Sequence, residues 1–118
     1  MKKILIAEDN ESNYILMNYI LKNIYEFDHA KNGKEAVEMA DAGAYDLVLM
    51  DIKMPVMDGL EATQAIKEKH PDLPVVALTA NAFDSDRLLA MKAGCSEFIA
   101  KPVNREKCLQ VIEKIIGK

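Results

Sequence analysis

The sequence predicts an α/β protein in which a five-stranded parallel sheet is doubly wound, with helices on both faces. It contains four short, strongly apolar runs, near residues 4–7, 46–50, 75–78 and 98–100. These runs have the length of buried strands, and a stretch with the apolar spacing of a helix follows each of them. Strands that alternate with helices are typical of a parallel sheet, because parallel neighbours need a crossover connection and such crossovers are right-handed.

The first half of the chain begins with a strand at Lys3–Ala7, whose unbroken apolar character is typical of burial on both faces. A weaker strand is predicted at Glu26–Ala30. Asn32 and Glu35 form an N-cap and its reciprocal partner for the second helix, which ends at Gly43. The first helix lies between these two strands, and its apolar residues at helical spacing are Ile15, Leu16, Tyr19, Ile20 and Ile24.

The central part of the chain contains the most apolar strand, which is predicted at Asp46–Met50. Asp58 and Glu61 form a second capping pair, which predicts a helix that ends before Pro71. The next strand is predicted at Pro74–Thr79. This third repeat of strand and helix supports the alternating pattern.

The last third of the chain continues with a helix at Ser85–Ala93, whose large apolar residues are Leu88 and Leu89. A short strand follows at Glu97–Ala100, and the last helix begins near Asn104. The apolar stripe of that helix consists of Cys108, Val111, Ile112 and Ile115.

Length and composition restrict the possible functions. The 118 residues suit one domain, so we expect a single domain over 1–118 without an output domain. The formal charge of −4 and the lack of a basic block argue against nucleic acid as a partner. No apolar run reaches the roughly 18 residues of a membrane span, so we expect a cytoplasmic protein without membrane insertion. Cys95 and Cys108 lack metal-site spacing and are predicted to be core thiols.

Charged and polar residues follow the predicted strands at the edge where doubly wound sheets bind ligands. They are Glu8, Asp9, Asp51, Thr79 and Lys101. Two carboxylates about 4 Å apart repel by roughly 4 kcal/mol at an effective dielectric of 20, so three of them require a cation. A set of oxygen ligands favours Mg²⁺ or Mn²⁺ over zinc.

A divalent ion with few protein ligands typically bridges to a phosphoryl oxygen, which explains why Thr79 and Lys101 face the same edge. The loop after the first strand has no glycine-rich cradle for a nucleotide phosphate. A covalent acceptor fits better, and Asp51 is placed to attack phosphorus as a carboxylate nucleophile. The product would be an acyl phosphate.

With these motifs the chain resembles the receiver domains of two-component response regulators. Four motifs in the correct order carry the resemblance: Glu8-Asp9-Asn10, Asp51-Ile-Lys-Met-Pro-Val-Met-Asp-Gly59, Thr79-Ala80 and Lys101-Pro102. The resemblance implies a flavodoxin-like fold with strand order 2-1-3-4-5. It also implies a cis Lys101-Pro102 peptide bond.

The resemblance assigns roles to the residues of the metal and acceptor site. Asp51 is then the phosphorylated aspartate. Asp9 and Asp51 bind Mg²⁺ together with the backbone carbonyl of Lys53. Glu8 holds a water molecule that is bound to the metal ion.

Further residues are implied to bind the phosphoryl group and respond to it. Thr79 and Lys101 grip its oxygens, and Phe98 swings inward as the switch residue, without the hydroxyl of the more common tyrosine. Lys53 and Asn81 flank the phosphoryl entrance and tune hydrolysis.

The resemblance also implies the partners. The phosphoryl group comes from a phosphohistidine on a histidine kinase or a histidine phosphotransfer protein. The face made by the fourth helix, the last strand and the last helix then controls a downstream protein target. Such a chain is not a conventional enzyme, since it catalyses its own phosphorylation and slow dephosphorylation. It is either a free-standing regulator or the receiver of a hybrid histidine kinase.

Two other functions fit the same fold class. A flavodoxin-like cofactor-binding protein needs a loop rich in Ser, Thr and Gly after the first strand, whereas this loop reads Glu8-Asp9-Asn10-Glu11. A metal-dependent phosphatase with an aspartyl intermediate usually has an acid two residues after the nucleophile, and here that residue is Lys53.

Overall fold

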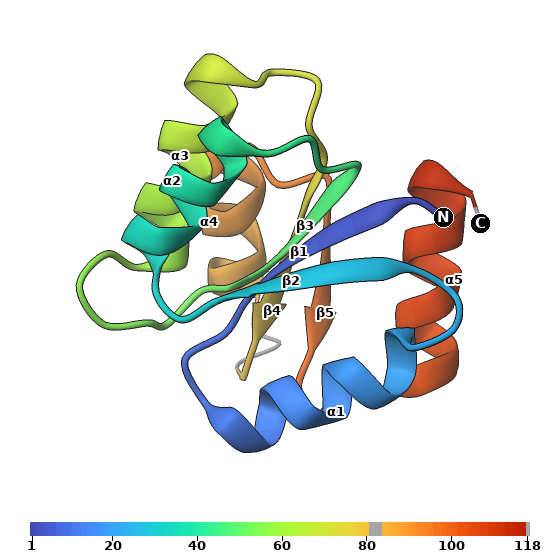
Figure 1. The fold of residues 1–118 in the computed structure, drawn as a ribbon. Helices are drawn as coiled ribbons and strands as arrows, with labels where there is room; N and C mark the ends of the chain where they lie inside the picture. Colours follow the sequence, from blue (N-terminus) through green and yellow to red (C-terminus); the bar gives the residue numbers. More distant parts are fainter. Residues whose placement is uncertain (81–83, 118) are drawn as a thin grey trace.

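A computed structural model describes residues 1–80 and 84–117 and has the predicted doubly wound architecture. All five strands are parallel and lie in the order β2-β1-β3-β4-β5. Helices α1 and α5 cover one face of the sheet, and α2, α3 and α4 cover the other (Figure 1). The elements are β1 (Lys3–Ala7), α1 (Glu11–Leu21), β2 (Glu26–Ala30), α2 (Gly33–Ala42), β3 (Leu47–Asp51), α3 (Gly59–Lys69), β4 (Val75–Thr79), α4 (Asp84–Ala93), β5 (Glu97–Ala100) and α5 (Arg105–Ile116).

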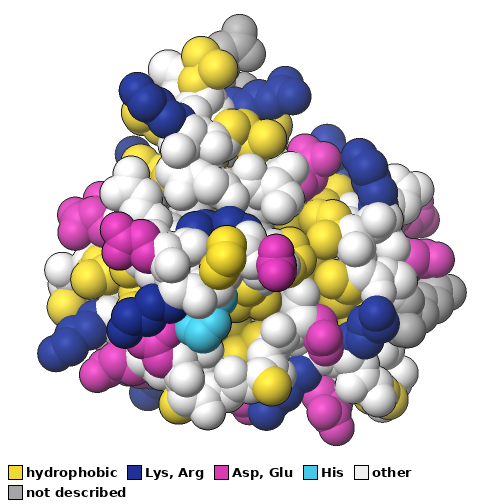
Figure 2. Space-filling model, turned by 90° about the horizontal axis from the view of Figure 1, so that it is seen from above, with side chains coloured by type: hydrophobic (Ala, Val, Ile, Leu, Met, Phe, Trp, Pro, Cys, Tyr) yellow, Lys and Arg dark blue, Asp and Glu magenta, His cyan; other side chains and the backbone are white. Residues whose placement is uncertain are grey.

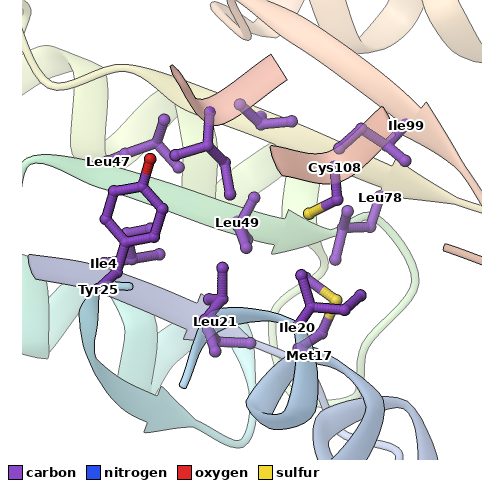
Figure 3. Packing of buried hydrophobic residues seen from close by; sticks show 13 residues of the cluster. Ile4, Met17, Ile20, Leu21, Tyr25, Leu47, Leu49, Leu78, Ile99 and Cys108 are labelled. Carbon is purple, nitrogen blue, oxygen red and sulfur yellow. The ribbon is translucent and has the colours of Figure 1, made fainter. Parts of the chain in front are cut away.

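The core consists of two apolar layers, one on each side of the sheet. Successive strand residues point to opposite faces, so Ile4 and Ile6 enter one layer while Leu5 and Ala7 enter the other. Figure 3 shows the first layer, in which side chains of α1 and α5 meet those of the central strands. Both predicted core thiols are buried, Cys108 in this layer and Cys95 in the second.

Strand β3 is shifted by one residue from its predicted position. It spans Leu47–Asp51 instead of Asp46–Met50, and Asp51 pairs with Leu78 of β4. Asp46 lies before the strand and accepts a hydrogen bond from the Lys3 amide through its carboxylate. Asp51 is therefore the last residue of the central strand, and the pairing of β3 with β4 holds its backbone in place.

Two of the apolar residues whose helical spacing predicted α1 are exposed. Ile15 and Tyr19 keep 59% and 60% of their surface accessible. The residues that this helix buries are Met17, Ile20 and Leu21. Apolar residues occupy more than one face of α1, so their spacing did not determine which face meets the sheet.

The large apolar residues of α4 are exposed as well, Leu88 at 68% and Leu89 at 52%. The buried residues among those described are Ala90 and Ala93, one helical turn apart. Small side chains let this helix approach the sheet closely, while its large apolar side chains remain accessible.

Four helices begin with an N-cap whose side chain accepts a hydrogen bond from the amide three residues later, and these caps are Asn10, Asn32, Asp58 and Asn104. Asn32 and Asp58 cap these helices as predicted, since they accept from the amides of Glu35 and Glu61. The reciprocal half of the prediction is not met at Glu35, whose carboxylate accepts from the Lys31 amide and not from the Asn32 amide. The N-termini of these helices lie at the carboxyl ends of the strands, so the caps fix the loops around that edge. None of the helices in the described ranges has the length and apolarity to cross a membrane.

Candidate functional site

A cleft of about 200 Å³ lies at the carboxyl ends of the central strands. The five residues predicted to meet at this edge all line it: Glu8, Asp9, Asp51, Thr79 and Lys101. Lys53 also lines the cleft, as do Asn10 and Asn13 at the start of α1. The prediction that separate strand ends form one polar site is therefore confirmed by the geometry.

The Lys101 side chain bridges two carboxylates in this cleft. Its Nζ lies 3.1 Å from Asp51 Oδ2 and 3.1 Å from Glu8 Oε1. Glu8 and Asp51 are buried, whereas Asp9 is exposed at the cleft mouth. Carboxylate oxygens of Glu8, Asp9 and Asp51 all lie within 4.8 Å of one another. One ammonium therefore faces three acids.

The electrostatics of the cleft disfavour a second buried negative charge. Burial, together with the neighbouring Asp51, raises the pKa of Glu8 from 4.5 to about 7, and Lys101 opposes this shift. Burial lowers the pKa of Lys101, but its contacts with Asp51 and Glu8 outweigh that effect, and the pKa is raised. Lys101 is therefore a permanent cation here, and one positive charge does not balance the three acids.

The donor set fits a hard divalent cation. Among the described residues, Glu8 Oε1 is the buried side-chain atom that accepts no hydrogen bond, since its 3.1 Å approach to Lys101 is an ion-pair contact without hydrogen-bond geometry. A buried oxygen without a hydrogen bond is costly, so it is available for a metal ion or for water bound to one. All three acids offer oxygen, which suits Mg²⁺.

The loop after β3 is held tightly against the strand end. The Lys53 amide donates a hydrogen bond to Asp51 Oδ1 at 3.3 Å, which closes an Asx turn. The Gly59 amide donates to the Ile52 carbonyl at 2.7 Å. A Cβ atom on Gly59 would lie 2.1 Å from the Asp51 carbonyl oxygen, so only glycine permits this approach. The Asp51 carboxylate and the Lys53 backbone are therefore fixed relative to each other.

The remaining predicted residues occupy different positions. Thr79 is the buried last residue of β4, and its carbonyl accepts a hydrogen bond from the Lys101 amide at 2.7 Å. Phe98 does not line the cleft; it packs with the core layer under α2, α3 and α4, and the Arg87 guanidinium lies 5.4 Å from its ring centroid. Asn81 lies outside the described residues. The Lys101-Pro102 peptide bond is cis, as expected.

Sequence reasoning missed two residues beside the cleft. His29 at the end of β2 contacts the backbone of Glu8, and Tyr14 of α1 stacks on the His29 ring. No motif contains either residue, and the contact joins segments that the sequence pattern does not bring together. Only the register of β1 against β2 could have indicated the contact between His29 and Glu8, because Ile6 pairs with His29 and Glu8 lies two residues further along the chain.

On the face of the molecule shown in Figure 2, acidic and basic side chains are interspersed, and the basic ones form no patch. This agrees with the slightly acidic composition of the chain.

Comparison with known proteins gives a consistent result. A sequence model of the family described as "Response regulator receiver domain" matches residues 4–113. Hybrid signal transduction histidine kinase B of Dictyostelium discoideum is 43% identical over 97% of this chain, which spans 7% of that relative. The polar-differentiation response regulator DivK of Brucella anthropi is 34% identical, over 98% of this chain and 97% of its own length. The chain thus spans a small part of the hybrid kinases that it matches and nearly all of DivK.

Solved structures of similar fold include the receiver domain of the sensor histidine kinase PA1611 from Pseudomonas aeruginosa, with a magnesium ion coordinated in its active-site cleft. It has a TM-score of 0.91 and 34% identity, over 99% of this chain and 98% of that one. The receiver domain of Ssk1 from Saccharomyces cerevisiae, in complex with the histidine phosphotransfer protein Ypd1, has a TM-score of 0.90 and 30% identity, over 98% and 88% of the two chains. The chain belongs to the response regulator receiver domain family.

Proposed function

We propose that this receiver is activated by phosphorylation of Asp51, with Mg²⁺ as its cofactor. One observation carries the proposal: the Asp51 carboxylate lies 3.1 Å from the Lys101 ammonium, and its oxygens are within 4.8 Å of those of two further acids. This arrangement provides a nucleophile, a fixed cation and a cation site in one cleft.

The metal ligands would be Asp9, Asp51 and the backbone carbonyl of Lys53, with Glu8 holding a water molecule bound to the ion. All four residues line the cleft. Mg²⁺ bound here supplies positive charge that neutralises the phosphoryl oxygens. Mn²⁺ has the same preference for oxygen ligands and would substitute for it.

Phosphoryl transfer requires Asp51 to attack phosphorus in line with the nitrogen of a phosphohistidine. The oxygen–phosphorus bond forms as the phosphorus–nitrogen bond breaks, and the imidazole nitrogen retains the electron pair. Lys101 contacts the Asp51 carboxylate and would form an ion pair with the phosphoryl oxygens once they are bound to Asp51. The Thr79 hydroxyl at the end of β4 would donate a hydrogen bond to the same group. Water later hydrolyses the acyl phosphate, at a rate that Lys53 and Asn81 tune.

The response would proceed from the site to the α4-β5-α5 face. A backbone hydrogen bond joins Thr79 and Lys101 at the ends of β4 and β5. If both side chains move toward the phosphoryl group, the ends of two neighbouring strands move with them. Phe98 of β5 would follow this movement through packing. A charged hydrogen bond contributes about 1.5–3 kcal/mol, whereas full inversion of an equilibrium needs about 5.5 kcal/mol. We therefore propose a graded shift that binding of a protein target completes.

The donor would be a histidine kinase or a histidine phosphotransfer protein, and the complex of a similar receiver with Ypd1 supports this choice. The receiver would act in the cytoplasm through contact with a downstream protein target. We propose that residues 1–118 form one receiver domain.

The test is mass spectrometry of the intact protein after incubation with acetyl phosphate and Mg²⁺. We expect the native chain and the control Asp72→Asn, an exposed position outside this cleft, to gain the mass of one phosphoryl group. We expect no gain in Asp51→Asn, nor in native protein treated with a chelator. Phosphorylation of Asp51→Asn at the native level would contradict the proposal.

A further inference from the structure

His29 is the penultimate residue of the edge strand β2, which contributes no side chain to the cleft lining. Its Nε2 atom is 2.7 Å from the backbone carbonyl oxygen of Glu8. A carbonyl oxygen can only accept a hydrogen bond, so the proton lies on Nε2 and His29 is the donor. The half-buried ring thus contacts the backbone of the cleft without reaching its carboxylates.

Two residues of β2 contact the backbone of Glu8, one at its amide and one at its carbonyl. The pairing of the strands ends at Ala7 and Ala30, and the Glu8 amide donates to the Ala30 carbonyl at 3.0 Å. The His29 side chain then satisfies the Glu8 carbonyl. The side chain therefore replaces the next backbone partner and extends the order of the sheet by one peptide unit.

That peptide unit joins the two acids of the loop. The carbonyl of Glu8 and the amide of Asp9 belong to the same planar group, so the hydrogen bond from His29 restricts the orientation of both residues. Glu8 directs its carboxylate inward to Lys101, while Asp9 remains exposed at the mouth. A rotation of this peptide would move both carboxylates.

Tyr14 of α1 fixes the orientation of the His29 ring. The two ring centroids are 3.7 Å apart and the planes differ by 4°, which is a parallel stack. Tyr14 itself packs against the core layer shared by α1 and α5. The core thus holds Tyr14, and Tyr14 fixes the plane of the His29 ring. This limits the directions in which the His29 Nε2 atom can point.

We propose that His29 is a positioning residue that holds the Glu8–Asp9 peptide in its metal-binding orientation, with Tyr14 holding the His29 ring. This inference rests on the proposed function, in which these acids bind Mg²⁺. Partners that orient metal ligands typically change metal affinity by about 10-fold to 100-fold when they are removed. Since His29 acts through the backbone, we expect the lower end of this range.

The test compares Mg²⁺ affinity in His29→Phe and His29→Gln by titration followed through amide NMR signals. Phenylalanine keeps a ring to stack on Tyr14 but has no donor, whereas glutamine restores an N–H donor at a similar reach. We expect Mg²⁺ affinity to fall about 10-fold in His29→Phe and by no more than about threefold in His29→Gln. The same substitutions at His70, which bonds Asp41 outside this cleft, are the matched controls and should leave affinity unchanged.

A second measurement needs no metal ion. Hydrogen exchange of the Glu8 amide in chelator should be faster in His29→Phe than in the native chain, and close to native in His29→Gln. If the native chain bound no Mg²⁺, the metal assignment would fail, and exchange at Glu8 would still decide the role of His29. Native affinity and native exchange in His29→Phe would overturn the inference. Equal losses in both His29 variants, with equally lowered thermal stability, would also overturn it, because they would indicate packing alone.

Discussion

Lys101 and Asp51 form an ion pair of 3.1 Å that joins the ends of two strands separated by β4. The same ammonium contacts Glu8, so the residue after β5 neutralises part of the charge at the ends of β1 and β3. The pair gives the cleft its asymmetry, with a fixed cation on one side and the exposed Asp9 on the other. The predictions below depend on this arrangement.

Removal of the Lys101 charge should destabilise the protein in a way that Mg²⁺ reverses. Lys101→Gln leaves Glu8 and Asp51 without their ammonium, and loss of one partner of a buried ion pair costs about 3–5 kcal/mol. Lys101 is partly exposed, so we expect a smaller loss of about 1–3 kcal/mol in the free energy of unfolding. Chemical denaturation with and without Mg²⁺ checks this. Equal stabilisation of the variant and the native chain by Mg²⁺ would argue against a shared charge site.

The raised pKa of Glu8 predicts that stability declines as pH rises. The folded state holds a proton on Glu8 up to about pH 7, whereas the unfolded chain loses it near 4.5, so the folded state binds more protons in this window. The free energy of unfolding should therefore fall between these values, by an amount on the order of 3 kcal/mol, and level off above them. Urea denaturation across this range, in chelator, measures the decline. Glu8→Gln should abolish most of it, and an unchanged slope in that variant would refute the assignment.

Gly33 should resist substitution although it begins a helix. Alanine in place of glycine in a helix normally adds up to about 1 kcal/mol. Here a Cβ atom would lie 2.1 Å from the Met57 carbonyl oxygen, which already accepts a hydrogen bond from the Gly33 amide. The clash involves backbone atoms, so we expect Gly33→Ala to lower the free energy of unfolding by about 1–3 kcal/mol. The exposed neighbour Lys34 supplies the control, and Lys34→Ala should be close to neutral in the same denaturation experiment.

Lys53 should protect the acyl phosphate. It lines the cleft two residues after Asp51, and its side chain is exposed where water would approach the phosphoryl group. We expect a shorter acyl-phosphate lifetime in Lys53→Ala than in the native chain, measured by release of inorganic phosphate after removal of the donor. Lys92→Ala, an exposed lysine outside this cleft, should leave the lifetime unchanged. Identical lifetimes in the native chain and Lys53→Ala would discard this role.

The sequence predicted the elements well where local chemistry defines them. The capping pairs Asn32–Glu35 and Asp58–Glu61 depend on side chains and amides three residues apart, so no distant contact was needed to place them. The strand-end residues of the cleft were also predictable, because parallel strands bring their carboxyl ends to one edge. The position of Asp51 inside β3 was not, since it depends on pairing with Leu78 of β4.

The exposed faces of the helices could not be predicted from spacing alone. Ile15 and Tyr19 on α1, and Leu88 and Leu89 on α4, are as apolar as core residues but remain accessible. An apolar pattern gives the same signal for a face that packs on a sheet and for a face that is exposed to solvent. The role of His29 was hidden for a different reason, because its partner is the backbone of Glu8, which carries no sequence signal.

The most direct test of the central claim is a calorimetric titration of the native chain with Mg²⁺, alongside Asp9→Asn. The three acids lie within 4.8 Å of one another, and a divalent cation is the complement that their charge requires. We predict saturable binding at millimolar concentration or below in the native chain, and a loss of most of the affinity in Asp9→Asn. Absence of binding at millimolar Mg²⁺, or the same affinity in both proteins, would contradict the account.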